Sequence, residues 1–249
     1  MTETGPAVTE DRILGGAVLL AQPAKGYRAG IDASLLAAAC DATAGERVAD
    51  VGCGAGAVML AAAHRRADAI FTGLERDPAA LSLAHRNIAA NGMAERVQAR
   101  EADAALPFSR LGLKPFDAVL SNPPFFDDPG ALRAPAPEKS AAWMAEAGLA
   151  GWIGFLLKAV REGGTITLIH RADRLADILV GFGGKAGSVK IRAVQPFADQ
   201  PAKRVLVRAV KTGKAPLQLL PPLVLHEAGS KYTEAAERIL RGQADLGWG

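Results

Sequence analysis

The segment that most constrains the fold is residues 48–56, VADVGCGAG, in which an apolar strand runs directly into three closely spaced glycines. Glycine permits a sharp turn and lets the backbone approach a ligand closely, because it has no side chain. The order strand, glycine loop, helix is typical of nucleotide-binding α/β proteins. The pattern alone leaves the cofactor open, because Gly52, Gly54 and Ala57 also fit the dinucleotide-binding spacing.

Alternating strand and helix patterns surround this segment. The first part of the chain predicts strands at residues 47–51, 69–75, 96–101 and 116–121, with helices at 58–66 and 78–91. The second part predicts helices at 148–161, 171–180 and 232–240, and strands at 165–170, 189–195 and 204–211. The last two strands have a short connection and are expected to be antiparallel. This order predicts an α/β fold in which one doubly wound sheet carries helices on both faces.

The start of the chain is less regular. Residues 1–12 are polar and are expected to form a flexible tail. Residues 13–21 are apolar, but Glu10 and Asp11 stand where a signal peptide has a basic region, and the run is too short to span a bilayer. Two short apolar runs around its two glycines instead predict a β-hairpin, followed by a helix at residues 31–42.

A long loop is expected at residues 126–140, FDDPGALRAPAPEKS, which are rich in proline, alanine and charge. Loops of this length are usually functional or mobile. No repeat or convincing linker divides the chain, so we expect a single domain over residues 1–249. No metal site is expected, because the four histidines are scattered without ligand spacing.

Cysteine and charge content give weaker indications. The chain has 249 residues and only two cysteines, Cys40 and Cys53, so it has no disulfide framework and no tandem zinc-binding pattern. A reducing cytoplasm is the expected location. The formal net charge of +3 permits a nucleic-acid partner without requiring one.

Acidic residues stand at three successive strands. Asp50 precedes the glycines, Glu75 ends the next strand and could accept both hydroxyls of a ribose, and Asp103 follows the third strand, beside Ala104, where it could receive an adenine amino group. Taken singly, Glu75 or Asp103 could equally be a surface acid. Together they resemble the class I methyltransferase arrangement, and neither diphosphate contacts nor a hydride-transfer site are visible for a nicotinamide enzyme.

A second motif, Asn122-Pro123-Pro124-Phe125, follows the fourth strand, at the edge where ligands of such sheets bind. An amino nitrogen conjugated to a ring or carbonyl is a poor nucleophile, because its lone pair is delocalised. If the Asn122 side-chain oxygen and the Pro123 carbonyl accept its two hydrogens, the nitrogen can become pyramidal and attack a sulfonium methyl in line. The prolines remove competing backbone donors, and Phe125 offers a stacking face for a base.

These motifs, with three further segments, resemble the bacterial tRNA (adenine-N6)-methyltransferase family over about residues 13–242. The further segments are QPAKGYR at residues 22–28, leading to Asp32; RVLVR at 204–208; and a C-terminal part with His226, Tyr232 and ILRG at 239–242. One departure is Phe125, where many amino-methyltransferases carry Tyr, so a hydroxyl contact is lost.

The resemblance implies a Rossmann-like fold with a seven-stranded, mostly parallel sheet and an antiparallel C-terminal strand. It implies S-adenosylmethionine as cofactor and RNA, with tRNA as the expected kind, as partner. It also implies a segment at residues 13–30 that closes over the cofactor, beside a core at 31–242. Catalytic roles fall to Asn122, Pro123 and Phe125. The cofactor-binding residues implied are Tyr27, Arg28, Asp32, Asp50, Gly52, Cys53, Gly54, Gly56, Glu75, Asp103, Ala104 and Asn122.

Other acceptors remain open at this point. The same mechanism would serve guanine N2 in ribosomal RNA or a glutamine side chain in a protein, although glutamine enzymes usually carry a sizeable N-terminal helical domain. An RNA-binding protein that retains the fold without turnover is a third possibility. A basic run could contact phosphates or form a solvated strand face; it comprises Lys203, Arg204, Arg208, Lys211 and Lys214, with Arg133 and Lys139 in the long loop.

Overall fold

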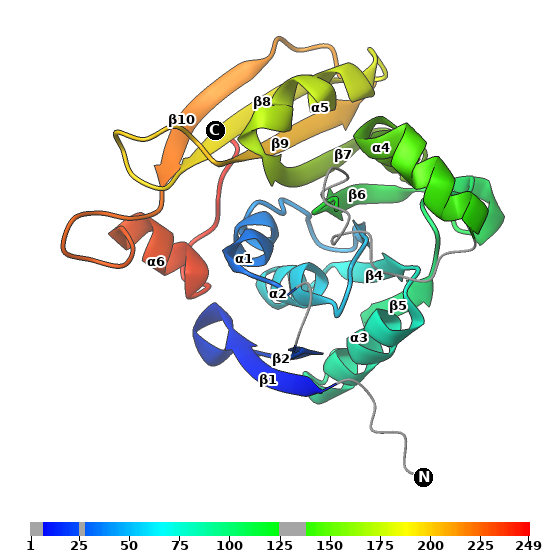
Figure 1. The fold of residues 1–249 in the computed structure, drawn as a ribbon, viewed down its shortest axis with the longest axis horizontal. Coiled ribbons are helices and arrows are strands. Elements are labelled where there is room, and N and C mark those ends of the chain that lie inside the picture. Colours follow the sequence, from blue (N-terminus) through cyan, green and yellow to red (C-terminus); the bar gives the residue numbers. More distant parts are fainter. Residues whose placement is uncertain (1–6, 25–27, 125–137) are drawn as a thin grey trace.

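An eight-stranded sheet forms the centre of the fold in the computed structural model (Figure 1). The structure describes residues 7–24, 28–124 and 138–249, without the side chains of residues 138–147. The predictions for Tyr27, Phe125, Arg133 and most of the long loop therefore lie outside the described residues. The sheet order is β10-β8-β9-β7-β6-β3-β4-β5. The strands are β3 Arg47–Val51, β4 Ile70–Glu75, β5 Val97–Glu101, β6 Phe116–Ser121, β7 Val160–Arg171, β8 Ala186–Gln195, β9 Arg204–Lys211 and β10 Gln218–Val224.

The sheet is mostly parallel, and the predicted fold class is confirmed. β9 runs antiparallel to both β7 and β8, as expected for the two late strands. The sheet has eight strands rather than seven, because β10 pairs in parallel with β8. No strand was predicted there, because Pro221 and Pro222 interrupt both the residue pattern and the ladder. A strand with prolines is tolerated at a sheet edge, where β10 lies.

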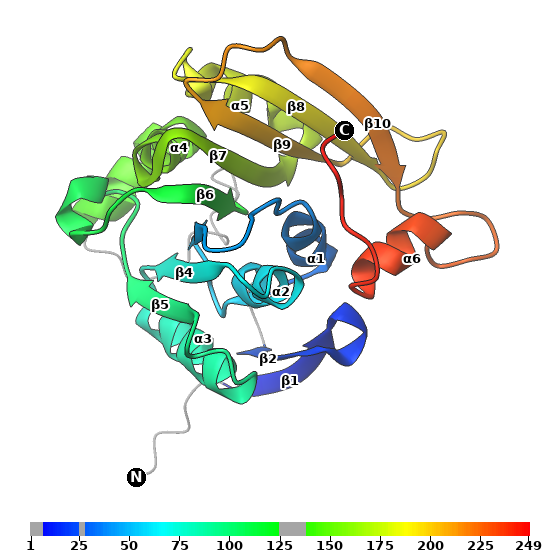
Figure 2. The same cartoon turned by 180° about the vertical axis from the view of Figure 1, so that it is seen from behind.

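Helices cover both faces of the sheet (Figure 1 and Figure 2). Val48 packs into the apolar cluster on one face and its neighbour Ala49 into the cluster on the other, as the two-residue period of a strand requires. The first cluster includes side chains of α1 Ile31–Ala38, α2 Ala57–Arg65, α3 Pro78–Ala90 and α6 Glu234–Leu240. The second includes side chains of α4 Glu138–Ala159 and α5 Leu175–Phe182. Among the described residues, no helix has both the length and the apolar character to cross a bilayer.

Several element boundaries differ from the sequence expectation. The hairpin consists of β1 Val8–Ile13 and β2 Val18–Pro23, so its first strand lies largely within the expected tail. α4 begins ten residues before the expected position 148, and Gly148 interrupts it with a φ of 50°. β7 begins at Val160 rather than at 165, because Gly163 and Gly164 lie inside the strand instead of before it.

Asn87 of α3 and Asn91, the residue that caps the C-terminal end of α3, bind the edge of this hairpin. The Asn87 side chain accepts from Ala21 N at 2.7 Å and donates to Ala21 O at 2.9 Å. Asn91 forms the same pair of bonds with Leu19, at 2.9 and 2.8 Å. Four helical residues rise about 6 Å and two strand residues about 6.6 Å, so the two spacings match. Asn87 also donates to Ala55 O at 2.9 Å and thereby joins the hairpin to the glycine loop.

Replacing Asn87 with Ala should lower the free energy of unfolding by about 2–4 kcal/mol, because buried backbone groups lose their partners. Asn87 is 1% exposed, whereas Asn91 is half-buried, so Asn91→Ala should cost clearly less. Urea denaturation of both variants checks this order. Equal losses would contradict a special role for Asn87.

Candidate active site

The predicted site residues gather at one edge of the sheet. β3 lies between β4 and β6 and runs parallel to both, so the carboxyl ends of the three strands lie together. The register pairs Val51 with Leu74 on one side and with Ser121 on the other. The glycine loop after β3, the carboxylate of Glu75 and the segment that begins at Asn122 are therefore neighbours. Ligands of open α/β sheets bind at this edge.

Two glycines of the loop are required for different reasons. Gly52 has a φ of 75°, and a Cβ there would lie 2.9 Å from the ring of Trp152. Gly54 has a φ of 55°, but no atom lies within 4 Å of the position that its Cβ would take. The loop is thus closed against Trp152 at one end and open at Gly54, where a ligand can approach the backbone.

Cys53 in the same loop packs inward. It is 7% exposed, and a Cβ on Gly73 would lie 2.6 Å from its Sγ. Burial raises the pKa of the thiol well above its usual value, so the thiolate that would react is disfavoured. This position therefore needs a small side chain rather than a reactive one.

Asp50 lies beneath the loop rather than on its surface. The side chain is 1% exposed, and its Oδ2 accepts from Met59 N at 3.0 Å, in the first turn of α2. Burial raises the pKa of Asp50 to about 7; the bond from Met59 lowers it and the nearby Glu75 carboxylate raises it further. Its contacts join β3 to the start of α2.

The Glu75 carboxylate binds backbone amides around the loop. Its Oε2 accepts from Gly54 N at 2.8 Å, and its Oε1 accepts from Arg76 N and Asp77 N, both at 2.8 Å. A carboxylate has about four acceptor positions, so about one remains. In this arrangement Glu75 can bind one hydroxyl group. The sequence predicted that it accepts both ribose hydroxyls, and this requires Glu75 to give up one of its backbone hydrogen bonds.

Asp103 and Ala104 follow β5 at the same edge. Asp103 is half-buried, and its Oδ1 accepts from Ala105 N at 2.9 Å, which leaves its second oxygen for a further donor. Ala104 is 8% exposed and packs in the second apolar cluster.

The segment that begins at Asn122 follows a buried polar contact. Ser121 Oγ donates to Val51 O at 2.9 Å and accepts the indole N–H of Trp152 at 2.9 Å. Ser121 is fully buried, whereas Asn122 beside it is half-buried and Pro123 buried. Asn122 is thus held at the boundary between the core and the site. Sequence reasoning missed Trp152, because a tryptophan in a predicted helix carries no signal for a contact 31 residues away.

The segment expected to close over the cofactor has other contacts here. The Arg28 guanidinium donates to Thr9 at 2.6 Å, to Pro23 O at 3.1 Å and to Asp11 at 2.7 Å, all in the hairpin. Asp32 accepts from Arg204 Nε at 2.9 Å, at the start of β9.

The basic residues of the run that lie on β9 form ion pairs with acidic residues. Besides Arg204, Arg208 pairs with Asp41 at 2.8 Å, and Lys211 pairs with Glu162 at 3.1 Å. Most of this run is therefore an ion-paired strand face.

His170 is a further buried group at this edge that the sequence did not single out. Its Nδ1 accepts from Arg171 N at 2.7 Å. Burial lowers its pKa to about 4, with contributions from Arg174, Arg171 and Arg204, so the ring is neutral near pH 7.

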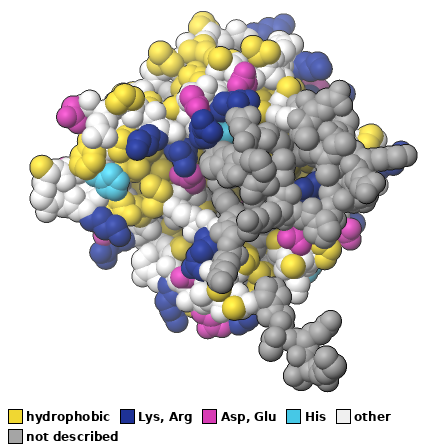
Figure 3. Space-filling model, in the orientation of Figure 1, with side chains coloured by type: hydrophobic (Ala, Val, Ile, Leu, Met, Phe, Trp, Pro, Cys, Tyr) yellow, Lys and Arg dark blue, Asp and Glu magenta, His cyan; other side chains and the backbone are white. Residues whose placement is uncertain are grey.

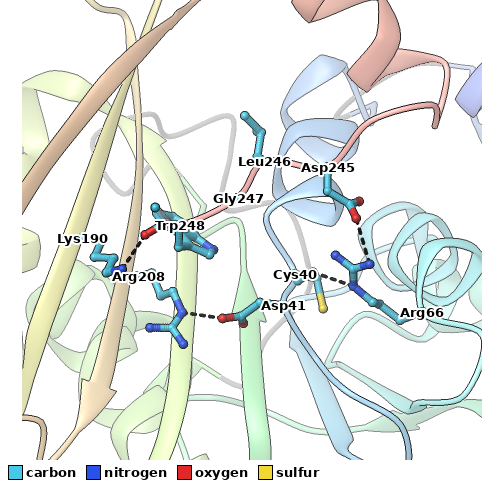
Figure 4. Close-up of a pocket in the computed structure, with 10 residues that line it drawn as sticks. Cys40, Asp41, Arg66, Lys190, Arg208, Asp245, Leu246, Gly247 and Trp248 are labelled. Atoms are coloured by element: carbon cyan, nitrogen blue, oxygen red, sulfur yellow. Dashed lines mark hydrogen bonds and ion pairs between the residues drawn. The ribbon is translucent and has the colours of Figure 1, made fainter.

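A pocket of about 450 Å³ lies elsewhere, beside the C-terminal tail (Figure 4). Ion pairs on its wall join Arg208 to Asp41 and Arg66 to Asp245 at 2.9 Å. Trp248 also lines it and donates its indole N–H to Ala39 O at 2.8 Å. None of the site residues expected from the sequence lines this pocket, so we assign it to the packing of the tail.

Comparison with known proteins agrees with this geometry. The family model "Methyltransferase small domain" matches residues 28–134. A tRNA1(Val) (adenine(37)-N6)-methyltransferase from Pasteurella multocida is 31% identical over 144 residues, 57% of this chain and 60% of the relative, so the match spans less than two thirds of its length. One from Shewanella amazonensis is 30% identical over 221 residues, 84% of this chain and 88% of the relative.

Two further proteins are also similar. The solved structure of a predicted O-methyltransferase from Agrobacterium tumefaciens has a TM-score of 0.72 and 30% identity, and the match covers 86% of this chain and 98% of that one. A release factor glutamine methyltransferase from Gloeobacter violaceus is 40% identical, but only over 86 residues, 34% of this chain and 29% of the relative.

Fold and comparisons together place the chain among the class I methyltransferases, whose cofactor is S-adenosylmethionine. Within this class, the chain belongs to the same family as the bacterial tRNA1(Val) (adenine(37)-N6)-methyltransferases. The resemblance expected from the sequence is thereby confirmed. The edge described above fits the cofactor, because the backbone at Gly54 is open and a carboxylate lies beside it.

Trp152→Phe should weaken S-adenosylmethionine binding about fivefold, since losing one buried hydrogen bond beside Gly52 costs about 1 kcal/mol. Trp248→Phe is the matched control, because it also removes an indole hydrogen bond to a buried partner but lies at the pocket beside the C-terminal tail. Calorimetric titration should show normal affinity for the control. An unchanged affinity in Trp152→Phe would contradict the role of this contact.

Asp50→Asn should change how stability depends on pH. The pKa of about 7 lies above the ordinary 3.8, so between about pH 4 and 7 the folded state binds more protons. Stability from this group therefore increases as the pH falls through 7 toward 4. Urea denaturation should show the wild type gaining roughly 1 kcal/mol or more over the variant across this window. A pH-independent difference would overturn the assignment; the effect of His170 is common to both proteins.

Proposed function

We propose that this protein transfers a methyl group from S-adenosylmethionine to N6 of an adenine in tRNA. The observation that carries the proposal is the pairing of Val51 with Ser121, since it sets the glycine loop and Asn122 side by side at one edge. Relatives that match most of the chain carry this activity in their names. The glutamine methyltransferase matches only about a third of the chain. This supports a cofactor-binding part in common between the two proteins rather than the same methyl acceptor.

In this proposal the glycine loop, with Gly52, Cys53, Gly54 and Gly56, accommodates the cofactor against its backbone. Glu75 binds the ribose after exchanging one backbone partner, and Asp103 beside Ala104 receives the adenine amino group. Asp50 acts from beneath by fixing the loop, as its bond to Met59 N suggests. Tyr27, Arg28 and Asp32 would close the site, which for Arg28 requires it to leave its hairpin contacts.

The acceptor chemistry assigned to Asn122 and Pro123 needs only hydrogen-bond acceptors. The Asn122 side-chain oxygen and the Pro123 carbonyl accept the two amino hydrogens, so the nitrogen lone pair becomes available for attack. Bound S-adenosylmethionine supplies an electrophilic methyl group in line with that nitrogen. Phe125 would stack on the base. Positioning provides most of the acceleration, since well-oriented partners reach effective molarities of about 10⁵–10⁸ M.

We also propose that residues 1–249 form one domain. The support for this is a single sheet that contains strands from both halves of the chain. A cytoplasmic location belongs to the same proposal; its support is that Cys40 and Cys53 are both free thiols.

Asn122→Ala should reduce methyl transfer to bulk tRNA by about 10²–10³-fold, the range seen when one preorganised polar group is removed from an active site. The measurement uses labelled cofactor, followed by digestion of the RNA to nucleosides. Gln98→Ala is the control, because this exposed amide lies on β5.

The product identifies the acceptor. N6-methyladenosine in the tRNA fraction supports the proposal, whereas N2-methylguanosine favours a ribosomal RNA substrate. Transfer to a protein glutamine would favour the third acceptor. Cofactor binding without transfer to any of these would indicate a non-catalytic RNA-binding protein.

A further inference from the structure

The edge that holds Asn122 continues to the far side of the sheet. β9 is antiparallel to both β7 and β8, so β8 runs in the same direction as β7 and β6, and β10 is parallel to β8. The loops at residues 196–203, after β8, and 225–233, after β10, therefore leave from the same edge as Asn122. At about 4.8 Å per strand, they begin about 14 and 19 Å from β6.

These two loops bring three aromatic rings into a row. The ring of Phe197 lies 5.4 Å from that of His226, and the His226 ring is stacked on Tyr232 at 5.4 Å and 24°. Phe197 is 39% exposed, whereas His226 and Tyr232 are half-buried. The row therefore ends at the surface in an open ring face or edge.

Backbone bonds hold this row in place. His226 N donates to Pro196 O at 2.8 Å, which joins the two loops directly. Thr233 N donates to Leu225 O at 2.9 Å, and its hydroxyl to Val224 O at 2.8 Å. The rings are thus part of a fixed surface, and stacking a ligand on it requires little ordering.

Two exposed lysines lie on the same two loops as the rings. Lys231 Nζ lies 5.3 Å from the Tyr232 ring centre, and Lys203 ends the first loop. Neither has an acidic partner among the described residues, in contrast to the paired Arg204, Arg208 and Lys211. Figure 3 shows Lys and Arg side chains gathered near the middle of one face and, beside them, a histidine among hydrophobic side chains.

We infer that the row Phe197–His226–Tyr232, with Lys203 and Lys231, binds a single-stranded segment of the RNA substrate that flanks the methylated nucleotide. Rings that stack on bases beside cations that contact phosphates are the two elements of single-strand recognition. This inference rests on the proposed function, because it takes RNA to be the substrate. It assigns a role to the C-terminal His226 and Tyr232, which the methyl-transfer site does not use.

The test measures binding of the full-length protein to bulk tRNA and to a single-stranded RNA of about 12 nucleotides, by fluorescence anisotropy at several salt concentrations. Phe197→Ala should weaken both about 5- to 30-fold, whereas Phe197→Trp, which keeps a ring, should bind within about twofold of wild type. Lys231→Gln should reduce the salt dependence by about one phosphate contact.

Matched controls are Val180→Ala, an apolar side chain that is 78% exposed on α5, and Lys114→Gln, an exposed lysine before β6 at the opposite edge. Both should bind RNA normally, and S-adenosylmethionine affinity should be unchanged in every variant. Wild-type binding by Phe197→Ala, or binding of a protein substrate but no RNA by the wild type, overturns the inference. Weakened binding by Phe197→Ala supports it even where no methyl transfer is found, so failure of the proposed function remains distinguishable.

Discussion

A single hydroxyl group fixes the geometry from which both halves of the site extend. Ser121 Oγ donates to the Val51 carbonyl and accepts the Trp152 indole N–H, so the ends of β3 and β6 and the helix α4 share one contact. All three residues are at most 7% exposed. Breaking the contact would leave buried polar groups unpaired at about 1–3 kcal/mol each. The glycine loop and the segment that begins at Asn122 therefore start from one rigid point.

The glycine loop is held on two sides and open between them. Trp152 fills the space that a side chain on Gly52 would need, and Asn87 donates to the Ala55 carbonyl at 2.9 Å. Gly54, between these contacts, has open space where a Cβ would lie. Because Asn87 also binds the hairpin strand β2, the packing of the N-terminal hairpin is coupled to the shape of the loop.

Local signals predicted the core of the fold and the location of the candidate site. The strand-glycine-helix order and the acids at strand ends depend on neighbours in sequence, so they could be recognised before pairing was known. Contacts between distant residues could not. The hydrogen bond from Trp152 to Ser121 spans 31 residues. The bond from Gly54 N to Glu75 depends on how the glycine loop folds against the end of β4. β10 was missed because its two prolines remove the donors that define a strand pattern.

The charges of the second half show why composition cannot locate a binding face. Arg204 and Arg208 look like phosphate contacts in the sequence, but their partners, Asp32 and Asp41, lie 172 and 167 residues away. Such pairs largely cancel at distances beyond the Debye length of about 8 Å, so they attract a distant anion little. Among the described residues, Lys203 and Lys231 have no acidic partner; Lys231 lies against the Tyr232 ring, and Lys203 lies on the loop that carries Phe197. Under the proposed function, methyl transfer takes place at the centre of this edge, whereas the RNA is selected farther along it, on the loops that carry Phe197 and Tyr232.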